Sequence, residues 1–363
     1  MQIFLTAFQS VPDPRAANTT HDLSELLMIA FTAVLCGAQN CSEMVTFGRA
    51  KMEFLKRFLR LKNGVPSHDT FSAVFRAIDP KALDQAFGEL TAALIEKLGR
   101  GAVIAIDGKS LRGAYDKGEA SSPRMMVSAY ASELRLTLAT VEADNRNEVD
   151  AALEVLGLVD LKGKIVTGDA LHCNRKAAAQ IISQGGDYCL ALKGNQKALL
   201  SEAQSKFSTV RANLRVAHQK TKDHGRLETR TATIVTIKEA AKRHDFPGLK
   251  ALGRIEATRE IDGKAEQYVR FFALSRKLSP AVLLKVGRQH WQIENNLHWQ
   301  LDVTFGEDAA RNRKDNGPPN IAVLRRRALD VARSDKSKGS LNGKIKRAGW
   351  DDEFLVKMLS QMR

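Results

Sequence analysis

The chain has 363 residues, enough for one large core or for two to three modules. Lysine and arginine number 56 against 41 aspartates and glutamates, so the formal net charge is +15 and the sequence pI is near 9.7. An excess of this size is self-repelling and favours a polyanionic partner, either nucleic acid or an anionic membrane. The membrane is the weaker alternative. The most apolar stretch, residues 26–38, is well short of the ~20 residues of a spanning helix, and the basic region of a signal peptide is lacking.

The four cysteines indicate neither a disulfide framework nor a zinc site. No two of them form a CxxC pair, and their spacing fits no common zinc motif. We therefore expect reduced thiols in a cytoplasmic protein without a structural metal. The cysteines are Cys36, Cys41, Cys173 and Cys189.

Residues 1–98 are predicted to form an all-helical, basic module. Apolar residues recur at helical spacing from Leu23 to Leu35, and a second helix, rich in lysine and arginine, is expected over 43–61. After the turn at Asn63–Ser67 a short helix is expected over 68–77, and another begins after Asp79-Pro80. Basic helices joined by a turn are typical both of DNA contact and of a solvated charged surface, and the two interpretations carry equal weight.

The pattern changes to short β-rich runs after Gly99-Arg100-Gly101. In chain order the expected elements are strands at 102–107, 125–131 and 134–143, a helix at 147–158, a strand at 164–169, a helix at 174–183 and a strand at 187–193. Three strands followed by alternating helix and strand predict a mixed α/β sheet. The order is that of a ribonuclease-H-like core, whose first strand is central and places its carboxylate opposite that of the fourth strand.

The alternation stops after Lys193, and residues 195–278 are predicted to form a β-rich insertion. The insertion holds a strand-like run at 227–237 and a candidate hairpin with arms at 253–261 and 265–275, around Asp262-Gly263. The last helix of the core begins near Ser279-Pro280. The catalytic unit is thus expected to span 99–311, followed by a basic, partly helical tail at 312–363.

Three acidic residues lie where two strands and a helix can bring them together. Asp107 ends the run VIAID, Asp169 ends KIVTGD, and Glu294 lies inside HWQIENNLHW. Each alone is more often a cap or turn residue, but carboxylates on rigid elements are what two divalent metals need for phosphodiester chemistry. The sequence therefore predicts catalytic metal ligands for Mg²⁺ or Mn²⁺, with two ions expected. The rival third ligands are Asp302, Glu307 and Asp308.

Basic and polar residues follow the predicted strand ends. Lys109 and Arg112, beyond the first carboxylate, can neutralise a phosphate backbone, and Lys193 and Asn195 repeat the theme after the last core strand. Arg226 belongs to a charged turn that either contacts DNA or forms a solvated edge.

Histidines accompany the predicted site. His172, just after Asp169, either orients a water, carboxylate or phosphate, or caps a helix. His290 and His298 lie four residues before and after Glu294, so all three fall along one side of a helix, with Trp291 on the neighbouring stripe. The alternative is a helix that packs its tryptophans against the sheet with two satisfied histidines. A metalloprotease helix is disfavoured because HExxH is absent.

Several strings closely resemble the H-repeat-associated transposases, a family of bacterial insertion-sequence DDE transposases. They are AIDGKSLRGAYD, VTGDALHCNRKAAAQII, GGDYCLALKGNQ, DHGRLETR and RQHWQIENNLHWQLDVTFGEDAAR. The opening strings HDLSELLMIA and NGVPSHDTF resemble the helical domain that accompanies the family's catalytic domain, and the likeness covers residues 8–335. It implies that Asp107, Asp169 and Glu294 occupy the DDE positions of a ribonuclease-H-like core, with an insertion before the glutamate helix.

The resemblance implies a transposase that cuts the ends of its element and joins the 3′-hydroxyls to target DNA, as a homodimer on double-stranded DNA. One departure concerns the wider superfamily, because His290 takes the usual arginine place and Leu301 the usual lysine place. The phosphate contacts normally made by those residues must then come from elsewhere, and Arg288 or Lys193 are candidates. His290 is itself counted among the expected nucleic-acid-binding residues. A metal-dependent nuclease or resolvase and an inactive DNA-binding relic are the alternative functions.

Overall fold

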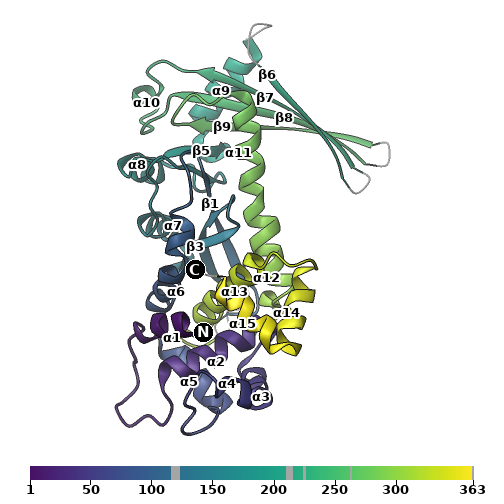
Figure 1. Ribbon diagram of the computed structural model, residues 1–363. Coiled ribbons are helices and arrows are strands. Elements are labelled where there is room, and N and C mark those ends of the chain that lie inside the picture. Colours follow the sequence, from purple (N-terminus) through teal and green to yellow (C-terminus); the bar gives the residue numbers. More distant parts are fainter. Residues whose placement is uncertain (116–122, 210–215, 224–225, 262–263, 362–363) are drawn as a thin grey trace.

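One mixed sheet forms the centre of the protein, with helices at one end and on both faces (Figure 1). The computed structural model describes residues 1–115, 123–209, 216–223, 226–261 and 264–361. Within these ranges the sheet has nine strands in the order β3-β2-β1-β4-β5-β9-β8-β7-β6. The strands are β1 (Val103–Leu111), β2 (Arg124–Ala131), β3 (Leu136–Glu142), β4 (Ile165–Gly168), β5 (Asp187–Leu192), β6 (Val216–Asp223), β7 (Arg226–Thr236), β8 (Ala251–Ile261) and β9 (Lys264–Leu274).

The first five strands confirm the predicted ribonuclease-H-like core. β1 pairs in parallel with β4, which pairs in parallel with β5, whereas β1, β2 and β3 are antiparallel. Helix α7 (Glu148–Gly157) contacts β1, β2 and β3, and α8 (Arg175–Ser183) contacts α7 and β5. Helix α11 (Pro280–Gln292) also contacts β1 and β4, and Figure 1 shows α7 and α11 on opposite sides of the sheet.

The later strands extend this same sheet. β9 runs antiparallel to β5, with Cys189 opposite Leu274, and β8, β7 and β6 follow in sequence. The two arms of the expected hairpin pair as β8 and β9, while its turn at 262–263 lies outside the described residues. β6 was not anticipated, because VAHQKTKD is polar and gives only a weak strand signal. Helix α9 (Lys197–Thr209) and the short α10 (Ala240–Arg243) accompany these strands.

The N-terminal helices pack around one apolar cluster. They are α1 (Gln2–Gln9), α2 (Leu23–Leu35), α3 (Cys41–Ala50), α4 (Met52–Leu55), α5 (His68–Ala77) and α6 (Pro80–Ile95). The single helix predicted over 43–61 is wrong, since the chain leaves helical geometry at Lys51 (φ −104°, ψ 19°). The ammonium of Lys51 pairs with Asp352 at 2.6 Å, a contact far away in sequence that helical periodicity does not reveal.

The segment expected to be a basic tail contains a core helix. Helix α13 (Gly317–Ser334) contacts α2, α5, α6 and β3, and the three consecutive arginines 325–327 are all buried. Helices α14 (Leu341–Trp350) and α15 (Asp352–Ser360) follow, and Figure 1 shows them beside the N-terminal helices. Positive charge in this segment therefore does not all face solvent. Among the described helices, none is both long and apolar enough to cross a bilayer.

A buried ion pair joins α13 to α6, and its groups hydrogen-bond to the free edge of strand β3. The guanidinium of Arg327 lies 2.6 Å from an Asp84 oxygen and donates to the carbonyl of Thr137. Asp84 accepts from the backbone N–H of Thr140, and Asp330 accepts from that of Thr137. β3 is the last strand on its side of the sheet, so these groups satisfy backbone atoms that a further strand would otherwise take.

Asp84→Ala is expected to destabilise the protein by about 3–5 kcal/mol, because it leaves Arg327 short of charge compensation inside the core. Glu353→Ala is the control, since Glu353 pairs with Arg57 at the surface, where a pair contributes less than about 1 kcal/mol. Equilibrium urea unfolding measures both. Equal losses for the two variants would contradict a structural role for the Asp84–Arg327 pair.

Candidate active site

Asp107 occupies the middle of strand β1. Its partner on β2 is Ser128, and the preceding residue, Ile106, pairs with Gly168 at the end of β4. Asp107 and Asp169 therefore stand at the same level on adjacent strands. The expectation that Asp107 ends its strand is wrong, because pairing with β2 continues to Leu111 after β4 has left the sheet.

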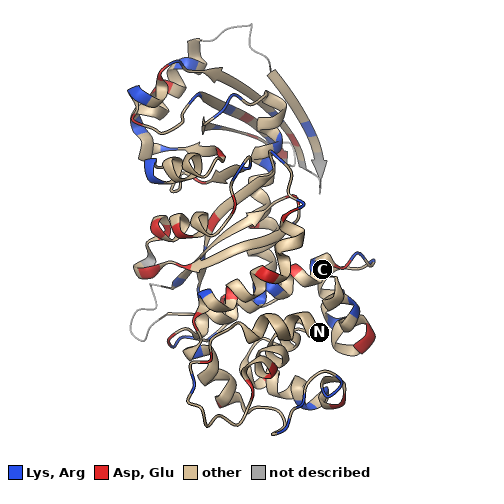
Figure 2. Ribbon diagram, turned by 60° about the vertical axis from the view of Figure 1, so that its left-hand side comes forward, with Lys and Arg blue, Asp and Glu red and all other residues tan. Residues whose placement is uncertain are grey.

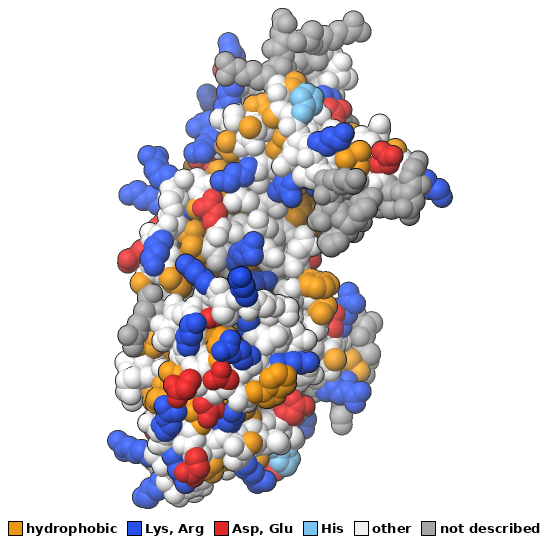
Figure 3. Space-filling view, turned by 45° about the vertical axis from the view of Figure 1, so that its right-hand side comes forward, with side chains coloured by type: hydrophobic (Ala, Val, Ile, Leu, Met, Phe, Trp, Pro, Cys, Tyr) orange, Lys and Arg blue, Asp and Glu red, His pale blue; other side chains and the backbone are white. Residues whose placement is uncertain are grey.

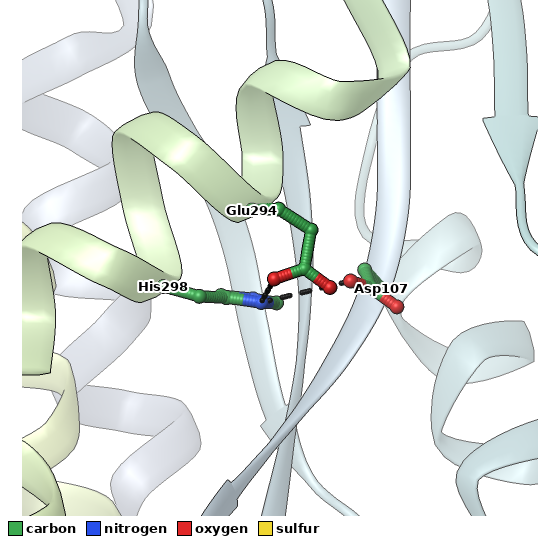
Figure 4. A group of neighbouring side chains, drawn as sticks. All are labelled: Asp107, Glu294 and His298. Atoms are coloured by element: carbon green, nitrogen blue, oxygen red, sulfur yellow. Dashed lines mark ion pairs between the residues drawn. The ribbon is translucent and has the colours of Figure 1, made fainter. Parts of the chain in front are cut away.

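Glu294 lies in a π-helical turn, η3 (Ile293–His298), between α11 and the short α12 (Trp299–Val303). A π turn carries an extra residue and changes which side chains face the sheet, and such turns are frequent at functional sites. His298 Nδ1 lies 3.5 Å from Glu294 Oε2 and 3.6 Å from Asp107 Oδ2, so one imidazole touches both carboxylates (Figure 4). Asp107, Glu294 and His298 thus lie together, whereas the predicted ligand set was Asp107, Asp169 and Glu294, with His298 as a supporting residue beside Glu294.

The carboxylates oppose one another electrostatically. Burial, helped by the charges of Glu294, Asp169 and Glu148, raises the pKa of Asp107 to about 8. The hydrogen bond from His298 lowers the pKa of Glu294 to about 2. At neutral pH the proton of the pair therefore resides on Asp107, and a bound cation has to displace it.

The charge of Asp169 helps to raise the pKa of Asp107, and its side chain also caps a turn. Its Oδ1 accepts from the backbone N–H groups of Leu171 and His172 at 2.8 and 3.3 Å. Among the described residues it is absent from the two groups of side chains whose ligand atoms converge within 4.8 Å. Its assignment as a metal ligand stays a prediction.

Glu148 and His172 form a pair beside Asp107 that the sequence predicted only in part. Glu148, the first residue of α7, has its Oε1 3.2 Å from Nε2 of His172, and these two side chains form a second convergent group with Asp107. Sequence reasoning missed Glu148, because an acid in the first turn of a helix is ordinary. His172 was expected near the site, and it lies there.

The side chains fit a divalent cation. The donors are carboxylate oxygens and imidazole nitrogens, a set suited to Mn²⁺ and, through its oxygens, to Mg²⁺. Nε2 of His298 and both ring nitrogens of His172 are buried without a hydrogen-bond partner among the described residues, as expected of groups that await a ligand. Asp107, Glu294 and His298 form one set of ligands, and Asp107, Glu148 and His172 the other.

The three acids considered as alternative third metal ligands, Asp302, Glu307 and Asp308, form ion pairs with basic residues. Lys109, 7% exposed, donates to Asp302 and Asp308 at 2.9 and 3.1 Å, and Glu307 pairs with Arg326 at 2.7 Å inside the core. Because Asp302 follows Glu294 on the same helical run, the Lys109 contact holds that run against β1. In this structure the Lys109 ammonium is thus engaged by protein carboxylates.

The other residues predicted to bind DNA differ in exposure. Arg112 is 78% exposed, Lys193 and Arg288 are also exposed, and Arg288 lines a groove of about 470 Å³ between α11 and β6. Asn195 donates to the carbonyls of Ala170 and Cys173, which anchors the turn after β4. Arg226 begins β7, but its side chain lies outside the part that the structure describes.

His290 and Trp291 behave differently from each other. Burial lowers the pKa of His290 to about 4, so the ring is neutral at pH 7, and its Nδ1 lies 3.1 Å from Thr167 Oγ1. Trp291 is 44% exposed and Trp299 55%, so the alternative of tryptophans packed against the sheet is wrong. The guanidinium of Arg270 lies 4.6 Å from the Trp291 ring centroid.

The chain is similar in sequence to known transposases. The family described as "Transposase DDE domain" matches residues 99–326, and the one described as "DDE_Tnp_1-associated" matches residues 5–91. "H repeat-associated putative transposase YhhI" of Escherichia coli strain K12 is 32% identical, with 96% of each chain covered. "Putative transposase YncI" of E. coli O157:H7 is 33% identical, covering 99% of this chain and 95% of its own. A solved piggyBac transposase synaptic complex with hairpin DNA aligns with 99% of this chain and 80% of its own, at a TM-score of 0.45 and 13% identity.

Asp107→Asn is expected to stabilise the metal-free protein more at about pH 8.5 than at about pH 5. The folded pKa of Asp107, about 8, exceeds the ~4 of an unfolded aspartate. The native state therefore holds an extra proton between these values and loses stability as the pH rises through the folded pKa. Asparagine does not ionise, so the variant lacks this loss of stability. The loss amounts to about 1.4 kcal/mol for each pKa unit between the unfolded and the folded value. Urea unfolding in EDTA measures the difference, and an equal effect at both pH values would contradict the raised pKa.

Proposed function

The chain belongs to the transposase DDE domain family, and we propose that it is the DNA transposase of a bacterial insertion sequence. The reaction is hydrolytic cleavage at the element ends followed by transfer of the freed 3′-hydroxyls into target DNA. The observation that carries the proposal is the convergence of Asp107 and Glu294, from a central strand and a π-helical turn, on one imidazole. The protein is proposed to act in the cytoplasm, on DNA of the nucleoid.

The active-site side chains have distinct tasks in this proposal. Asp107 and Glu294, with Asp169 as the third family position, would hold Mg²⁺ or Mn²⁺, of which two ions are expected. Metal bound there would supply activation of the attacking oxygen and neutralisation of charge on the phosphate. His298, whose Nδ1 lies close to both carboxylates, is the third ligand of this group. Lys109 acts as a positioning residue, since its pairs with Asp302 and Asp308 fix the helical run that carries Glu294.

Double-stranded DNA is the proposed partner. The formal net charge of the chain is +15. Figure 2 shows lysine and arginine at both the β-rich and the helical end. Lysine and arginine side chains gather through the middle of the face drawn in Figure 3. Arg112, Lys193 and Arg288 are exposed candidates for phosphate contact. Two copies are proposed to act together in the synaptic complex, one for each element end.

A nuclease or resolvase and an inactive relic are the alternatives. The relic is disfavoured, because a protein that only bound DNA would gain nothing from carboxylates held together against their repulsion. A nuclease would use the same residues and differ only in lacking the joining step, so products distinguish it.

Asp107→Asn, Asp169→Asn and Glu294→Gln are each expected to lower cleavage and joining by orders of magnitude, since each removes a charged ligand but keeps its shape. DNA binding should persist or tighten, because repulsion from phosphate is relieved. Gel assays on labelled element ends with Mg²⁺ score both products, and Glu133→Gln, at a surface pair with Lys285, is the control. Full activity of Glu294→Gln would remove Glu294 from the site, and cleavage without joining in the parent protein would favour the nuclease.

Duplex binding is expected to weaken steeply between about 50 and 200 mM salt, because lysine and arginine contacts release condensed counterions. Arg288→Ala should reduce the slope of log K against log salt by roughly one if Arg288 contacts a phosphate. Fluorescence anisotropy with a labelled duplex measures the slope. An affinity independent of salt would argue against DNA as the main partner.

A further inference from the structure

Asp107 belongs to two groups of potential ligands that come from different elements. Glu294 and His298 come from the π-helical turn, whereas Glu148 begins α7 and His172 lies between β4 and α8. In each group one ligand atom per residue lies within 4.8 Å of the others. The family positions account for Asp107 and Glu294, but they leave Glu148 and His172 without a role.

Two glycines make room for the Glu148–His172 pair. A Cβ at Gly108 would lie 2.6 Å from the carboxyl carbon of Glu148, and a Cβ at Gly168 would lie 2.8 Å from the Cβ of His172. Gly108 directly follows Asp107, and Gly168 directly precedes Asp169. Each strand thus omits a side chain beside its aspartate, where Glu148 or His172 comes close to the backbone. The pair is built into the site.

The chemistry of His172 points to a ligand. The side chain is 3% exposed, and neither ring nitrogen makes a hydrogen bond among the described residues, although Nε2 lies 3.2 Å from Glu148 Oε1. A buried polar group without a partner destabilises the folded protein. A cation bound by the imidazole and the two carboxylates would satisfy one ring nitrogen and separate like charges on Asp107 and Glu148.

We propose that Glu148 and His172 bind a divalent cation together with Asp107, at a position separate from the Glu294–His298 ligands. The inference rests on the proposed function, because the position belongs to the same active site and shares Asp107 with it. Asp107 then lies between the two cation positions and contributes to both. Glu148 is thereby a metal ligand in addition to the three acids of the family pattern.

The test is Mn²⁺ binding by the full-length, metal-free protein without DNA. Free Mn²⁺ is followed by electron paramagnetic resonance, and two ions per chain are expected for the parent protein. Glu148→Gln should lower this to one, Glu294→Gln should remove the other, and Asp107→Asn should weaken both. Glu154→Gln is the matched control, because Glu154 lies on the same helix and pairs with Lys81 at the surface. Parent-like Mn²⁺ binding by Glu148→Gln would overturn the inference.

A second variant separates ligation from structural support. His172→Gln should remove a ¹⁴N coupling from the spectrum of bound Mn²⁺, while His298→Gln should remove a different one. Circular dichroism in EDTA checks that each variant is folded. Retention of every nitrogen coupling in folded His172→Gln would also overturn the inference. If Glu294→Gln loses one Mn²⁺ and Glu148→Gln keeps both, only the proposed Glu148 position is refuted. If Glu148→Gln loses one Mn²⁺ and Glu294→Gln keeps both, Glu294 is not a metal ligand, which counts against the proposed function.

Discussion

The rest of the structure depends on Asp107, whose carboxylate is partly buried among other acids. Burial and the neighbouring charges raise its pKa to about 8, so its ionised form is unfavourable until a cation compensates the charge. Such an arrangement needs rigid supports on every side. β1 is held between β2 and β4, and the Glu294 run is held by Lys109, which contacts Asp302 and Asp308.

The supports continue through the molecule as a chain of buried ion pairs. Glu307 and Asp308 are consecutive in the short helix η4 (Glu307–Ala309), yet Glu307 pairs with Arg326 of α13 while Asp308 pairs with Lys109 of β1. The next arginine, Arg327, pairs with Asp84 of the N-terminal helices. The active-site strand, α13 and the helical end are therefore linked by side chains that lose much of their stabilisation if one partner is removed. Part of the basic charge thus serves the fold and is unavailable to DNA.

The core was predictable where local patterns decide the structure. Alternating and continuous apolar runs predicted β1 to β5, and the turn at Asn63–Ser67 marked the start of α5. Long-range contacts decided the rest. Lys51, at the helix break, pairs with Asp352. β9 extends the sheet by pairing with β5, and buried arginines of α13 pair with distant acids. None of these partners is visible within a local window of sequence.

The active site likewise combines features that local sequence patterns predict with features that only the folded structure reveals. Acids at the end of an apolar run and inside a helix indicated Asp107 and Glu294, but the π turn that aims Glu294 has no clear sequence signal. Lys109 was expected to face DNA because it lies close to Asp107 in sequence. The alternation of side chains along a strand predicts otherwise. Residues two apart on a strand point to the same face, so Lys109 points to the same side of the sheet as Asp107, into the protein. Arg112, beyond the end of β1, escapes that constraint and is exposed, which makes it the better candidate for phosphate contact.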